Sequence, residues 1–372
     1  MPEFYVGLIS GTSTDGVDSA LVDFEGATPR LIKALNHPYP ADLRGRVERL
    51  ITPEWRGTLT EFGHLHAALG RAFAEAAVRL LQEAGVEPAS VEAVGSHGQT
   101  VCHAPQGEDR FTLQLGDPNR IAALTGITTV ADFRGKDMAL GGQGAPLVPA
   151  FHATVLHSGS EDRAILNLGG IANLTVLPSD PGRAALGFDT GPANTLMDGW
   201  IRRHKNKGFD RNGSWAASGR VSTQLLDHLL SDPYFKIPAP KSTGREHFNQ
   251  AWLDGHLLAQ ADDIAPEDVQ TTLLELTARS IATAVKSCRP VPCRVIACGG
   301  GTHNKALMKR LSELLAPCPV QTSDEFGIPA DWMEAMAFAW LARQTLAGRP
   351  GNLPSATGAH RAAVLGAIYA AD

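Results

Sequence analysis

The feature that most constrains the fold is a glycine-rich turn near the N-terminus. An apolar run precedes residues 11–16 (GTSTDG), and a second apolar run, residues 19–24, follows them. Gly11 and Gly16 are expected to adopt the positive φ angles that bring backbone N–H groups close to a phosphate. Asp15 is suited to hold a phosphate-bound magnesium ion through water. The segment is predicted to be a β-hairpin with an anion-binding tip, and an ordinary polar turn is the alternative.

A second hairpin of the same design lies in the second half of the chain. Residues 163–168 and 171–177 are rich in β-branched and apolar side chains, which is typical of strands, and Gly169 and Gly170 join them. One polar-tipped hairpin near the start of each half indicates a duplicated domain.

A third glycine-rich turn, residues 299–304 (GGGTHN), lies between a predicted strand at residues 294–298 and a predicted helix at residues 305–315. Three consecutive glycines at a strand-to-helix junction let a flat or anionic group lie against bare backbone near a helix N-terminus. This turn is therefore a further candidate for ligand binding.

The three turns together resemble the ATP-binding turns of the actin, hexokinase and Hsp70 superfamily. Within it, the chain is similar to the anhydro-N-acetylmuramic acid kinase family. The segments that carry this resemblance span nearly the whole chain: residues 10–18, 95–100 (GSHGQT), 131–134 (ADFR), 141–149 (GGQGAPLVP), 187–192 (GFDTGP) and 298–301 (CGGG). The chain departs from the family pattern at Thr14, where leucine is expected, at Ala193, where glycine is usual, and at Gly135-Lys136, where two arginines are frequent.

The resemblance implies an α/β fold, namely a two-lobed actin-like ATPase (ribonuclease H-like) fold with central mixed sheets and an interlobe cleft. We expect an N-terminal lobe at residues 1–140 and a C-terminal lobe at residues 141–372. The Gly- and Pro-rich segment 141–149 is predicted to be the crossing and hinge between them. Apolar periodicity predicts a long helix at residues 59–83. The expected helices of the second lobe are 193–203, 225–230, 269–287, 305–315, 331–346 and a final one at 361–371.

The resemblance also implies that the two hairpin tips bind the phosphates of ATP with Mg²⁺ and that the third turn seats adenosine. The residues expected to contact the nucleotide are Gly11, Thr12, Ser13, Thr14, Asp15, Gly16, Val17, Asp18, Gly169, Gly170, Asn173, Gly299, Gly300, Gly301 and Asn304. Asp15 is the residue expected to approach the metal, through a water molecule.

Asp189 is the candidate catalytic base. It follows a short predicted strand at residues 185–188 and precedes a turn into a helix, a position that suits a general base held on rigid structure. Capping of that helix is the alternative, because Asp is a favoured N-cap residue. The resemblance favours the catalytic role and implies that Glu334 helps to orient the attacking water. A solvated helix glutamate is the alternative for Glu334.

The implied reaction is a coupled one. Asp189 deprotonates a water that attacks the anomeric carbon of 1,6-anhydro-N-acetylmuramic acid, and the freed O6 accepts the γ-phosphoryl group of ATP. The products are N-acetylmuramic acid 6-phosphate and ADP, formed in peptidoglycan recycling. An actin- or Hsp70-like regulatory ATPase without sugar chemistry is the alternative function. A dinucleotide oxidoreductase is not favoured, since no Gly-x-Gly-x-x-Gly follows the first strand.

The expected substrate-binding residues are polar side chains at predicted strand ends and in the glycine-rich loop. Arg134 can form a forked pair with a carboxylate or contact a phosphoryl oxygen, and Asp132 can orient it. A simple surface ion pair is the alternative for these two residues. His97, Gln99 and Gln143 are expected to bind sugar hydroxyls or the N-acetyl group, although a lone histidine is often structural.

Composition limits the partners of this 372-residue chain. With 43% hydrophobic and 19% charged residues and a net charge of −6, it has no excess of the Lys and Arg that a broad nucleic-acid or membrane surface needs. No apolar run approaches the ~20 residues of a membrane span, so a cytoplasmic protein is expected. Five cysteines without a Cys-x-x-Cys pair indicate free thiols rather than a disulfide or zinc framework. The family resemblance implies a homodimer.

Overall fold

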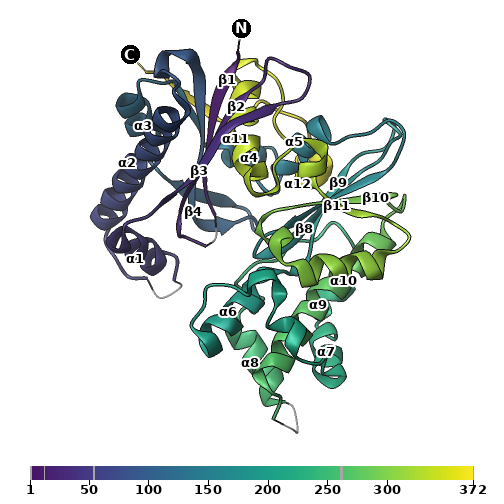
Figure 1. Cartoon of the computed structure of the whole chain (residues 1–372). Helices are drawn as coiled ribbons and strands as arrows, with labels where there is room; N and C mark the ends of the chain where they lie inside the picture. Colours follow the sequence, from purple (N-terminus) through teal and green to yellow (C-terminus); the bar gives the residue numbers. More distant parts are fainter. Residues whose placement is uncertain (1, 12, 53–54, 260–262, 372) are drawn as a thin grey trace. The chain divides into compact units, whose positions relative to one another are not determined.

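The computed structural model describes residues 2–11, 13–52, 55–259 and 263–371 (Figure 1). The chain divides into two compact units. Unit 1 contains Met1–Val155 and Trp332–Asp372, and unit 2 contains Leu156–Asp331. Unit 2 is thus inserted between two parts of unit 1.

Unit 1 is built on a seven-stranded mixed sheet with the strand order β12-β6-β4-β1-β2-β3, and β5 pairs with β4. Strand β1 pairs antiparallel with β2 and parallel with β4. The strands are β1 (Phe4–Ser10), β2 (Gly16–Asp23), β3 (Arg30–Pro38), β4 (Val91–Ala104), β5 (Phe111–Leu115), β6 (Thr129–Ala131) and β12 (Ala367–Tyr369). The helices are α1 (Ala41–Leu50), α2 (Leu59–Ala84), α3 (Pro118–Thr125), α4 (Phe133–Ala139), α5 (Val148–Val155), α11 (Met333–Leu346) and α12 (Pro354–Thr357).

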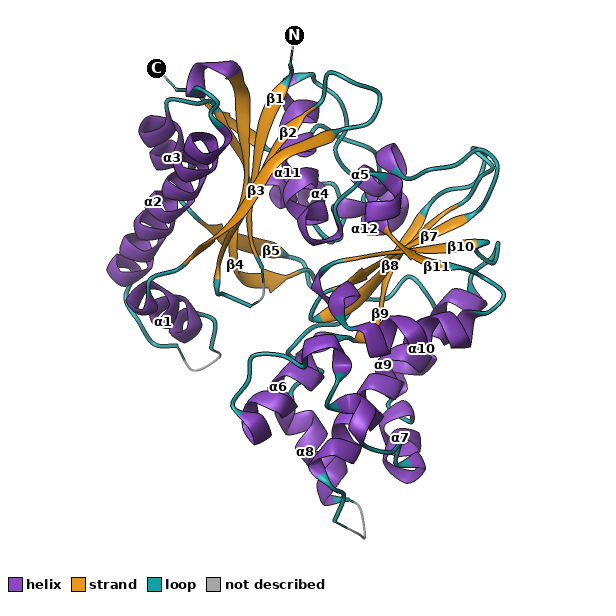
Figure 2. Ribbon diagram, in the orientation of Figure 1, coloured by secondary structure: helices purple, strands orange, loops and turns teal. Residues whose placement is uncertain are grey.

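Helices α2 and α11 lie on opposite faces of this sheet (Figure 2). Helix α2 begins with a capping box, in which Thr58 and Glu61 satisfy each other's backbone N–H groups. Helix α11 lies very close to the sheet, because two strands carry glycine where it crosses them. A Cβ atom on Gly7 would lie 1.8 Å from the carbonyl oxygen of Ala335, and one on Gly95 would lie 2.0 Å from that of Phe338.

Unit 2 is built on a five-stranded mixed sheet with the order β11-β10-β7-β8-β9. Strand β7 pairs antiparallel with β8 and parallel with β10. The strands are β7 (Arg163–Leu168), β8 (Ile171–Leu177), β9 (Leu186–Pro192), β10 (Arg294–Cys298) and β11 (Val320–Thr322). The helices are α6 (Asn194–Lys205), α7 (Thr223–Leu230), α8 (Gln250–Leu258), α9 (Pro266–Ser287) and α10 (Lys305–Leu315).

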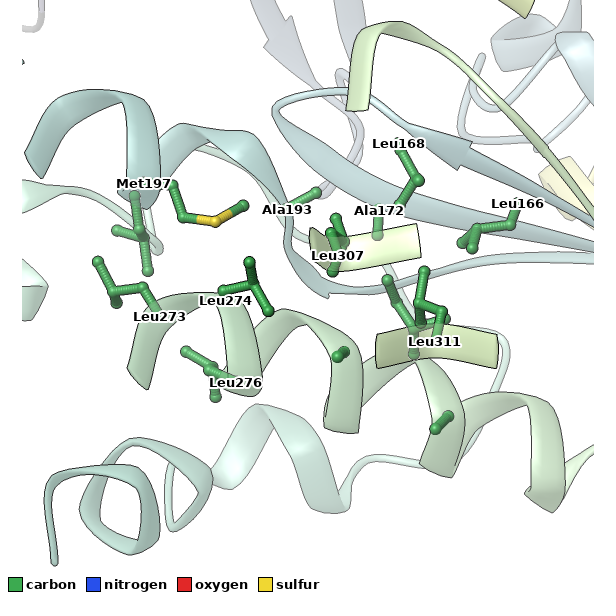
Figure 3. Packing of buried hydrophobic residues seen from close by; sticks show 14 of the residues in the cluster. Leu166, Leu168, Ala172, Ala193, Met197, Leu273, Leu274, Leu276, Leu307 and Leu311 are labelled. Carbon is green, nitrogen blue, oxygen red and sulfur yellow. The ribbon is translucent and has the colours of Figure 1, made fainter. Parts of the chain in front are cut away.

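The core of unit 2 forms where α6, α9 and α10 pack against the strands (Figure 3). Leu166 of β7 and Ala172 of β8 are fully buried, and so are Leu276 of α9 and Leu307 and Leu311 of α10. Burying such side chains contributes about 1.5–3 kcal/mol each, so this layer holds the β7–β8 hairpin in place.

The two sheets confirm the predicted α/β class with central mixed sheets and the repeated hairpin. In unit 1 the order β4-β1-β2-β3 matches the order β10-β7-β8-β9 in unit 2, including the parallel and antiparallel pairings. The predicted strands at 163–168, 171–177 and 294–298 and the helix at 305–315 have the observed bounds.

The predicted helix at residues 361–371 is wrong. The segment instead contains strand β12, whose Ile368 pairs with Val130 of β6. Gly366 precedes this strand with a φ of 84°, a left-handed conformation that ends any local helix. Pairing with the sheet therefore overrides the helix propensity of an alanine-rich tail.

The division of the chain also differs from the one expected at residues 140 and 141. Helix α11 packs on the sheet of unit 1, not among the helices of the second lobe. The segment 141–149 lies within unit 1 and is tied to it, since the N–H of Gln143 donates to the carbonyl of Thr357 at 2.8 Å. The chain passes from one unit to the other after Val155 and again after Asp331.

Candidate active-site residues in the two units

The tip of the β1–β2 hairpin is a compact turn in unit 1. The N–H of Thr14 donates to the carbonyl of Gly11 at 3.3 Å, and the hydroxyl of Ser13 donates to the carboxylate of Asp15 at 2.6 Å. Ser13 and Asp15 are exposed. The tip therefore presents a hydroxyl and a carboxylate to solvent, and Thr12 lies outside the described residues.

The expected conformation of the two glycines in this turn is wrong. Neither Gly11 nor Gly16 has a positive φ, whereas Thr14 does, at 53°. A β-branched residue rarely adopts this left-handed conformation. Gly16 is required for a different reason, because a Cβ atom there would lie 2.4 Å from the carbonyl oxygen of His37 on β3.

The two remaining predicted nucleotide contacts of this hairpin lie in strand β2. Val17 is fully buried, so its side chain belongs to the core. Asp18 is partly buried and accepts a hydrogen bond at 2.8 Å from the side-chain amide of Asn36 on β3.

Gln99 supports the tip of the β1–β2 hairpin through hydrogen bonds from its side chain. Its side chain is buried; Oε1 accepts from the hydroxyl of Ser10 at 2.6 Å, and Nε2 donates to the carbonyls of Thr100 and Gly11 at 3.2 and 3.4 Å. Both Oε1 and Nε2 of the side-chain amide are therefore hydrogen-bonded within the protein. They favour a supporting role for Gln99 over the direct sugar contact that the sequence suggests.

His97 holds Arg134 in unit 1. The guanidinium Nε donates to His97 Nε2 at 2.9 Å, and Nη1 donates to the carbonyl of Gly144 at 2.7 Å. Since Nε2 accepts, the proton of the neutral imidazole lies on Nδ1, which donates to the carbonyl of Gly98 at 2.9 Å. Burial lowers the pKa of His97 well below its ordinary value, and the Arg134 cation lowers it further.

Arg134 keeps an electrostatic link to Glu334 of α11. Burial lowers the pKa of Arg134 to about 10, and the negative charges of Glu334 and Asp137 oppose that change. Glu334 itself is exposed in the first turn of α11. These two predicted site residues are therefore brought together within unit 1.

Asp132 does not hold Arg134 among the described residues. It is exposed, has a φ of 57°, and precedes α4 without capping it through its side chain. The residue that organises this region is instead Asp137, which is fully buried. Its carboxylate accepts from the N–H of Gly144 at 2.9 Å, from Asn352 at 2.7 Å and from the hydroxyl of Thr357 at 2.8 Å.

Asp137 thereby fixes the glycine-rich loop that contains Gln143. The backbone of Gln143 is bound to Thr357, and its side chain is partly exposed. A buried carboxylate with three donors is stable only as a complete network. No local periodicity or motif marks Asp137, because its side-chain partners Asn352 and Thr357 lie more than 200 residues away.

The tip of the β7–β8 hairpin in unit 2 is joined to the start of α6. The carbonyl of Gly170 accepts from the N–H groups of Ala193 and Thr195 at 2.9 and 3.1 Å. The side-chain amide of Asn194 donates to the carbonyls of Leu168 and Gly169 at 3.0 and 2.8 Å. The first N–H groups of α6, which have no partner within the helix, are satisfied in this way.

The third glycine turn lies against this hairpin. Gly299 has a φ of 83°, and a Cβ atom there would lie 2.5 Å from Oδ1 of Asn167. A Cβ atom on Gly301 would lie 2.6 Å from that of Leu168, while Gly300 is exposed with open space beside it. Two of the three predicted nucleotide-binding turns therefore meet within unit 2.

Asn304 is buried and caps helix α10. Its Oδ1 accepts from the N–H of Leu307 at 3.1 Å, which accounts for this residue structurally. The predicted nucleotide contact of Asn304 remains a prediction.

Asp189 lies within strand β9, and both of its carboxylate oxygens are held. Oδ1 accepts from the side-chain amide of Asn173 on β8 at 2.8 Å, and Oδ2 accepts from the N–H of Thr243 at 3.0 Å. The N-cap of α6 is Ala193, so the capping alternative for Asp189 is wrong.

Burial raises the pKa of Asp189 above its ordinary value. The hydrogen bonds from Asn173 and Thr243 oppose this shift, and the charge of Glu246 adds to it. A carboxylate with a raised pKa is a stronger base once ionised, and part of the Asp189 surface remains accessible. The arrangement suits proton abstraction from a water or hydroxyl.

The segment that covers Asp189 was not predicted from the sequence. The carbonyl of Asp189 accepts from the hydroxyl of Tyr234 at 2.8 Å, and its N–H donates to the carbonyl of Lys241 at 2.9 Å. The ammonium of Lys241 lies 4.3 Å from the centre of the Tyr234 ring. The only available signal was a polar, helix-breaking stretch at residues 239–244 (APKSTG) between two aromatic clusters.

The described residues contain no group of three or more His, Cys, Asp or Glu side chains placed to hold a metal ion. Magnesium in phosphate-transfer sites commonly uses one or two carboxylates, with substrate phosphates and water completing the shell. The exposed carboxylate of Asp15 fits that limited role.

Comparison with known proteins identifies the family. The family described as anhydro-N-acetylmuramic acid kinase matches residues 3–371. The chain belongs to the anhydro-N-acetylmuramic acid kinase family. The member from Coxiella burnetii (strain Dugway 5J108-111) is 53% identical over 367 residues, which cover 99% of this chain and 97% of the relative. The member from Saccharophagus degradans is 50% identical over 371 residues, with 99% of each chain covered.

Kinases of this family are phosphotransferases. A solved structure of a ROK family glucokinase from Streptomyces griseus, in complex with glucose and AMPPNP, covers 92% of this chain and 99% of its own. Its TM-score is 0.41 and its sequence identity 16%. In the described part of this family member, every helix is too short or too polar to cross a membrane.

Proposed function

We propose that this chain opens 1,6-anhydro-N-acetylmuramic acid with water and phosphorylates its O6 with ATP. Membership of the anhydro-N-acetylmuramic acid kinase family supports the substrate and the phosphate donor. The observation that carries the chemistry is the setting of Asp189, whose carboxylate is held by Asn173 and Thr243 and has a raised pKa. A rigid base with this property is what water activation requires.

In the proposed reaction, Asp189 takes a proton from a water molecule as the water oxygen bonds to the anomeric carbon C1. The bond between C1 and O6 breaks, and its electron pair goes to O6. The oxygen O6 then bonds to the γ-phosphorus of ATP, the bond to the β-phosphate oxygen breaks, and ADP leaves. The products are N-acetylmuramic acid 6-phosphate and ADP, as peptidoglycan recycling requires.

Unit 1 supplies the residues proposed to recognise the sugar. Arg134 is presented with Nε bound to His97 and Nη1 bound to Gly144, so Nη2 is the part of the guanidinium that neither bond uses. This amine is suited to bind the lactyl carboxylate of the substrate. Glu334, whose charge acts on Arg134, is proposed to help orient the attacking water.

The hairpin tips are proposed to bind the ATP phosphates. Ser13 and Asp15 are exposed at the first tip, and Gly169 and Gly170 form the second. Bound Mg²⁺ would neutralise charge on the phosphates, and Asp15 would hold it through water. We further propose that the enzyme works in the cytoplasm as a homodimer.

The test is to incubate the purified protein with ATP, Mg²⁺ and 1,6-anhydro-N-acetylmuramic acid in H₂¹⁸O and to analyse the product by mass spectrometry. The proposal predicts one phosphate and one ¹⁸O atom, located at C1. A phosphorylated sugar without ¹⁸O at C1 would refute the hydrolytic step. ATP hydrolysis at the same rate with and without the sugar, and no phosphorylated product, would refute the kinase reaction.

A further inference from the structure

A buried carboxylate, Asp232, closes the segment of unit 2 that covers Asp189. Asp232 is 9% exposed and lies directly before a short 3₁₀ helix. Its Oδ1 accepts from the N–H of Tyr234 at 2.9 Å. Its Oδ2 accepts from His247 Nε2 and from Trp252 Nε1, both at 2.9 Å, and these donors lie 15 and 20 residues further along the chain. The residues between 232 and 247, which we call the covering segment, therefore form a loop with both ends on one carboxylate.

The covering segment contacts Asp189 at three points. The hydroxyl of Tyr234 donates to the carbonyl of Asp189 at 2.8 Å. The carbonyl of Lys241 accepts from the N–H of Asp189 at 2.9 Å, and the N–H of Thr243 donates to its Oδ2 at 3.0 Å. Within the segment, the ammonium of Lys241 donates to the carbonyl of Tyr234 at 3.0 Å. All three contacts with Asp189 thus lie inside the loop that Asp232 closes.

Aromatic packing fixes the donors that reach Asp232. The side chain of Phe248 is fully buried. The centre of its ring lies 4.3 Å from that of His247, 5.1 Å from that of Trp252 and 5.5 Å from that of Tyr234. The residues that supply all three donors therefore pack on one buried ring, which limits their movement.

Asp232 makes these contacts as an ionised carboxylate. Burial opposes its ionisation, but the hydrogen bonds from His247, Tyr234 and Trp252 together lower the pKa of Asp232 below its ordinary value. Hydrogen bonds to an ionised acceptor are roughly twice as strong as bonds between neutral groups. A neutral amide in its place has one acceptor oxygen only, so it cannot accept from donors on both sides.

We infer that Asp232 is a positioning residue for the reaction, which holds the covering segment closed so that the N–H of Thr243 stays on the carboxylate of Asp189 and water is kept from that carboxylate. The inference rests on the proposed function, in which Asp189 is the base. Asp232 acts through the segment and not on the substrate. Its role is to keep a rigid base in a fixed setting.

This role predicts the direction in which the basicity of Asp189 changes when the segment loosens. Burial is the main cause that raises the pKa of Asp189, the charge of Glu246 adds to it, and the N–H of Thr243 opposes it. Glu246 and Thr243 both belong to the covering segment. Because burial has the largest effect, a loosened segment should lower the pKa of Asp189. The acid limb of the kcat/KM profile should then move to lower pH.

The experiment compares Asp232→Asn and Trp252→Phe with Asp162→Asn as the matched control. Asp162 also holds a loop of unit 2, since its Oδ1 accepts from the N–H and the hydroxyl of Ser179 at 2.7 and 2.9 Å. This contact lies at the opposite end of the β7–β8 hairpin from its glycine tip. Amide hydrogen exchange followed by mass spectrometry reports the opening of residues 240–246.

Steady-state kinetics at saturating ATP give kcat and the pH profile of kcat/KM for the anhydro sugar. Far-UV circular dichroism and urea unfolding check that each variant is folded.

We expect Asp232→Asn to speed exchange at residues 240–246 by at least about 10-fold, because two charge-assisted bonds are lost. Its kcat should fall about 10- to 100-fold, the scale for misplacing a reacting group, and its acid limb should move to lower pH. Trp252→Phe keeps an aromatic ring beside Phe248 but removes one donor, so it should change exchange and kcat about 3-fold in the same directions. Asp162→Asn should speed exchange only around Ser179 and leave the acid limb in place.

Unchanged exchange at residues 240–246 in both Asp232→Asn and Trp252→Phe would overturn the inference. A lower kcat with an acid limb that stays in place or moves to higher pH would also overturn it, because the burial of Asp189 would then not depend on Asp232. Trp252→Phe provides the same readouts if Asp232→Asn does not fold. Failure of the proposed function is distinct, since the wild-type protein would then not phosphorylate the sugar, while exchange at residues 240–246 would still respond to the variants.

Discussion

The two units carry the same carboxylate–amide pair in opposite orientations. In unit 1, Asp18 on the second strand accepts from Asn36 on the third at 2.8 Å. In unit 2, Asn173 on the second strand donates to Asp189 on the third, also at 2.8 Å. Both pairs are cross-strand partners, and Asp18 and Asn173 are each the third residue of their strand.

The carboxylates of Asp18 and Asp189 differ in how far other segments of the chain bury them. The pair in unit 1 is open to solvent on the outer strand β3, where Asn36 is exposed. In unit 2, the segment containing Tyr234, Lys241 and Thr243 folds over Asp189, and burial raises its pKa. The same pair of residue types on the same pair of strands thus stands in two settings, and the raised pKa of Asp189 follows from its burial and not from the pairing, because the amide of Asn173 lowers it.

The hairpin tips differ as well. In unit 2 the tip is joined to α6 by backbone hydrogen bonds and by Asn194. In unit 1 the N–H of Tyr39 donates to the carbonyl of Asp15 at 3.0 Å, and the buried amide of Gln99 makes a long bond of 3.4 Å to the carbonyl of Gly11. Among the described residues, the side-chain support of the first tip is therefore weaker than that of the second.

The largest expected effect separates the two carboxylates. Asp189→Asn keeps the shape of the side chain but removes its basicity, so turnover should fall at least ~100-fold while ADP affinity stays level. Asp18→Asn, the matched change in unit 1, should lower turnover by less than ~10-fold, because it removes no general base. Steady-state phosphorylation of the anhydro sugar and calorimetry with ADP give both quantities. Similar losses in the two variants would show that the covering segment does not distinguish them.

A second comparison concerns the glycine turn beside the second hairpin. Gly301→Ala places a methyl group against Leu168 and should reduce the free energy of unfolding by about 1–3 kcal/mol. Gly300→Ala faces open space and should change it by less than ~0.5 kcal/mol. Urea unfolding of the two variants measures the difference. Equal stabilities would contradict the close contact between the turn and the hairpin.

The pH dependence tests the amide of Asn173. Its hydrogen bond favours the ionised form of Asp189, so Asn173→Ala should raise the pKa of that carboxyl further. Because the reaction needs the ionised base, the acid limb of the kcat/KM profile should move up by about one pH unit. A uniform loss of rate with an unmoved limb would show that Asn173 only supports the fold.

The smallest effects should come from the residues that support the tips. Asn194→Ala removes two hydrogen bonds to the second tip and should raise the KM for ATP about 5-fold. Gln99→Ala removes one long bond to the first tip and should raise it about 2-fold. Steady-state kinetics at saturating sugar measure both. A larger effect of Gln99→Ala would reverse the order of support inferred for the two tips.

Local sequence patterns predicted the elements whose stabilising contacts are made between residues close together in the sequence. The strands 163–168 and 171–177 follow from β-branched alternation across a two-glycine turn, and the helix at 305–315 follows from its cap and apolar spacing. The tail at residues 361–371 failed because its strand exists only through pairing with β6. Helix α11 was predicted at the right place in the sequence but assigned to the wrong lobe for the same reason, since its partners Gly7 and Gly95 are distant in sequence.

The candidate residues divide in the same way. Asp189 and Arg134 lie in recognisable segments, and the structure gives each a setting that suits its predicted chemistry. The supporting roles of His97 and Gln99 were not evident, because a hydrogen bond to a distant side chain leaves no mark on local spacing. Asp137, Tyr234 and Thr243 were missed on the same physical ground.

The insertion of unit 2 within unit 1 has a consequence for biosynthesis. Residues 156–331 form one uninterrupted stretch, whereas the sheet of unit 1 lacks α11 and β12 until the last forty residues have been made. Domains fold as the ribosome releases them. Unit 2 can therefore fold on the nascent chain before the ribosome has synthesised α11, the helix that covers β1.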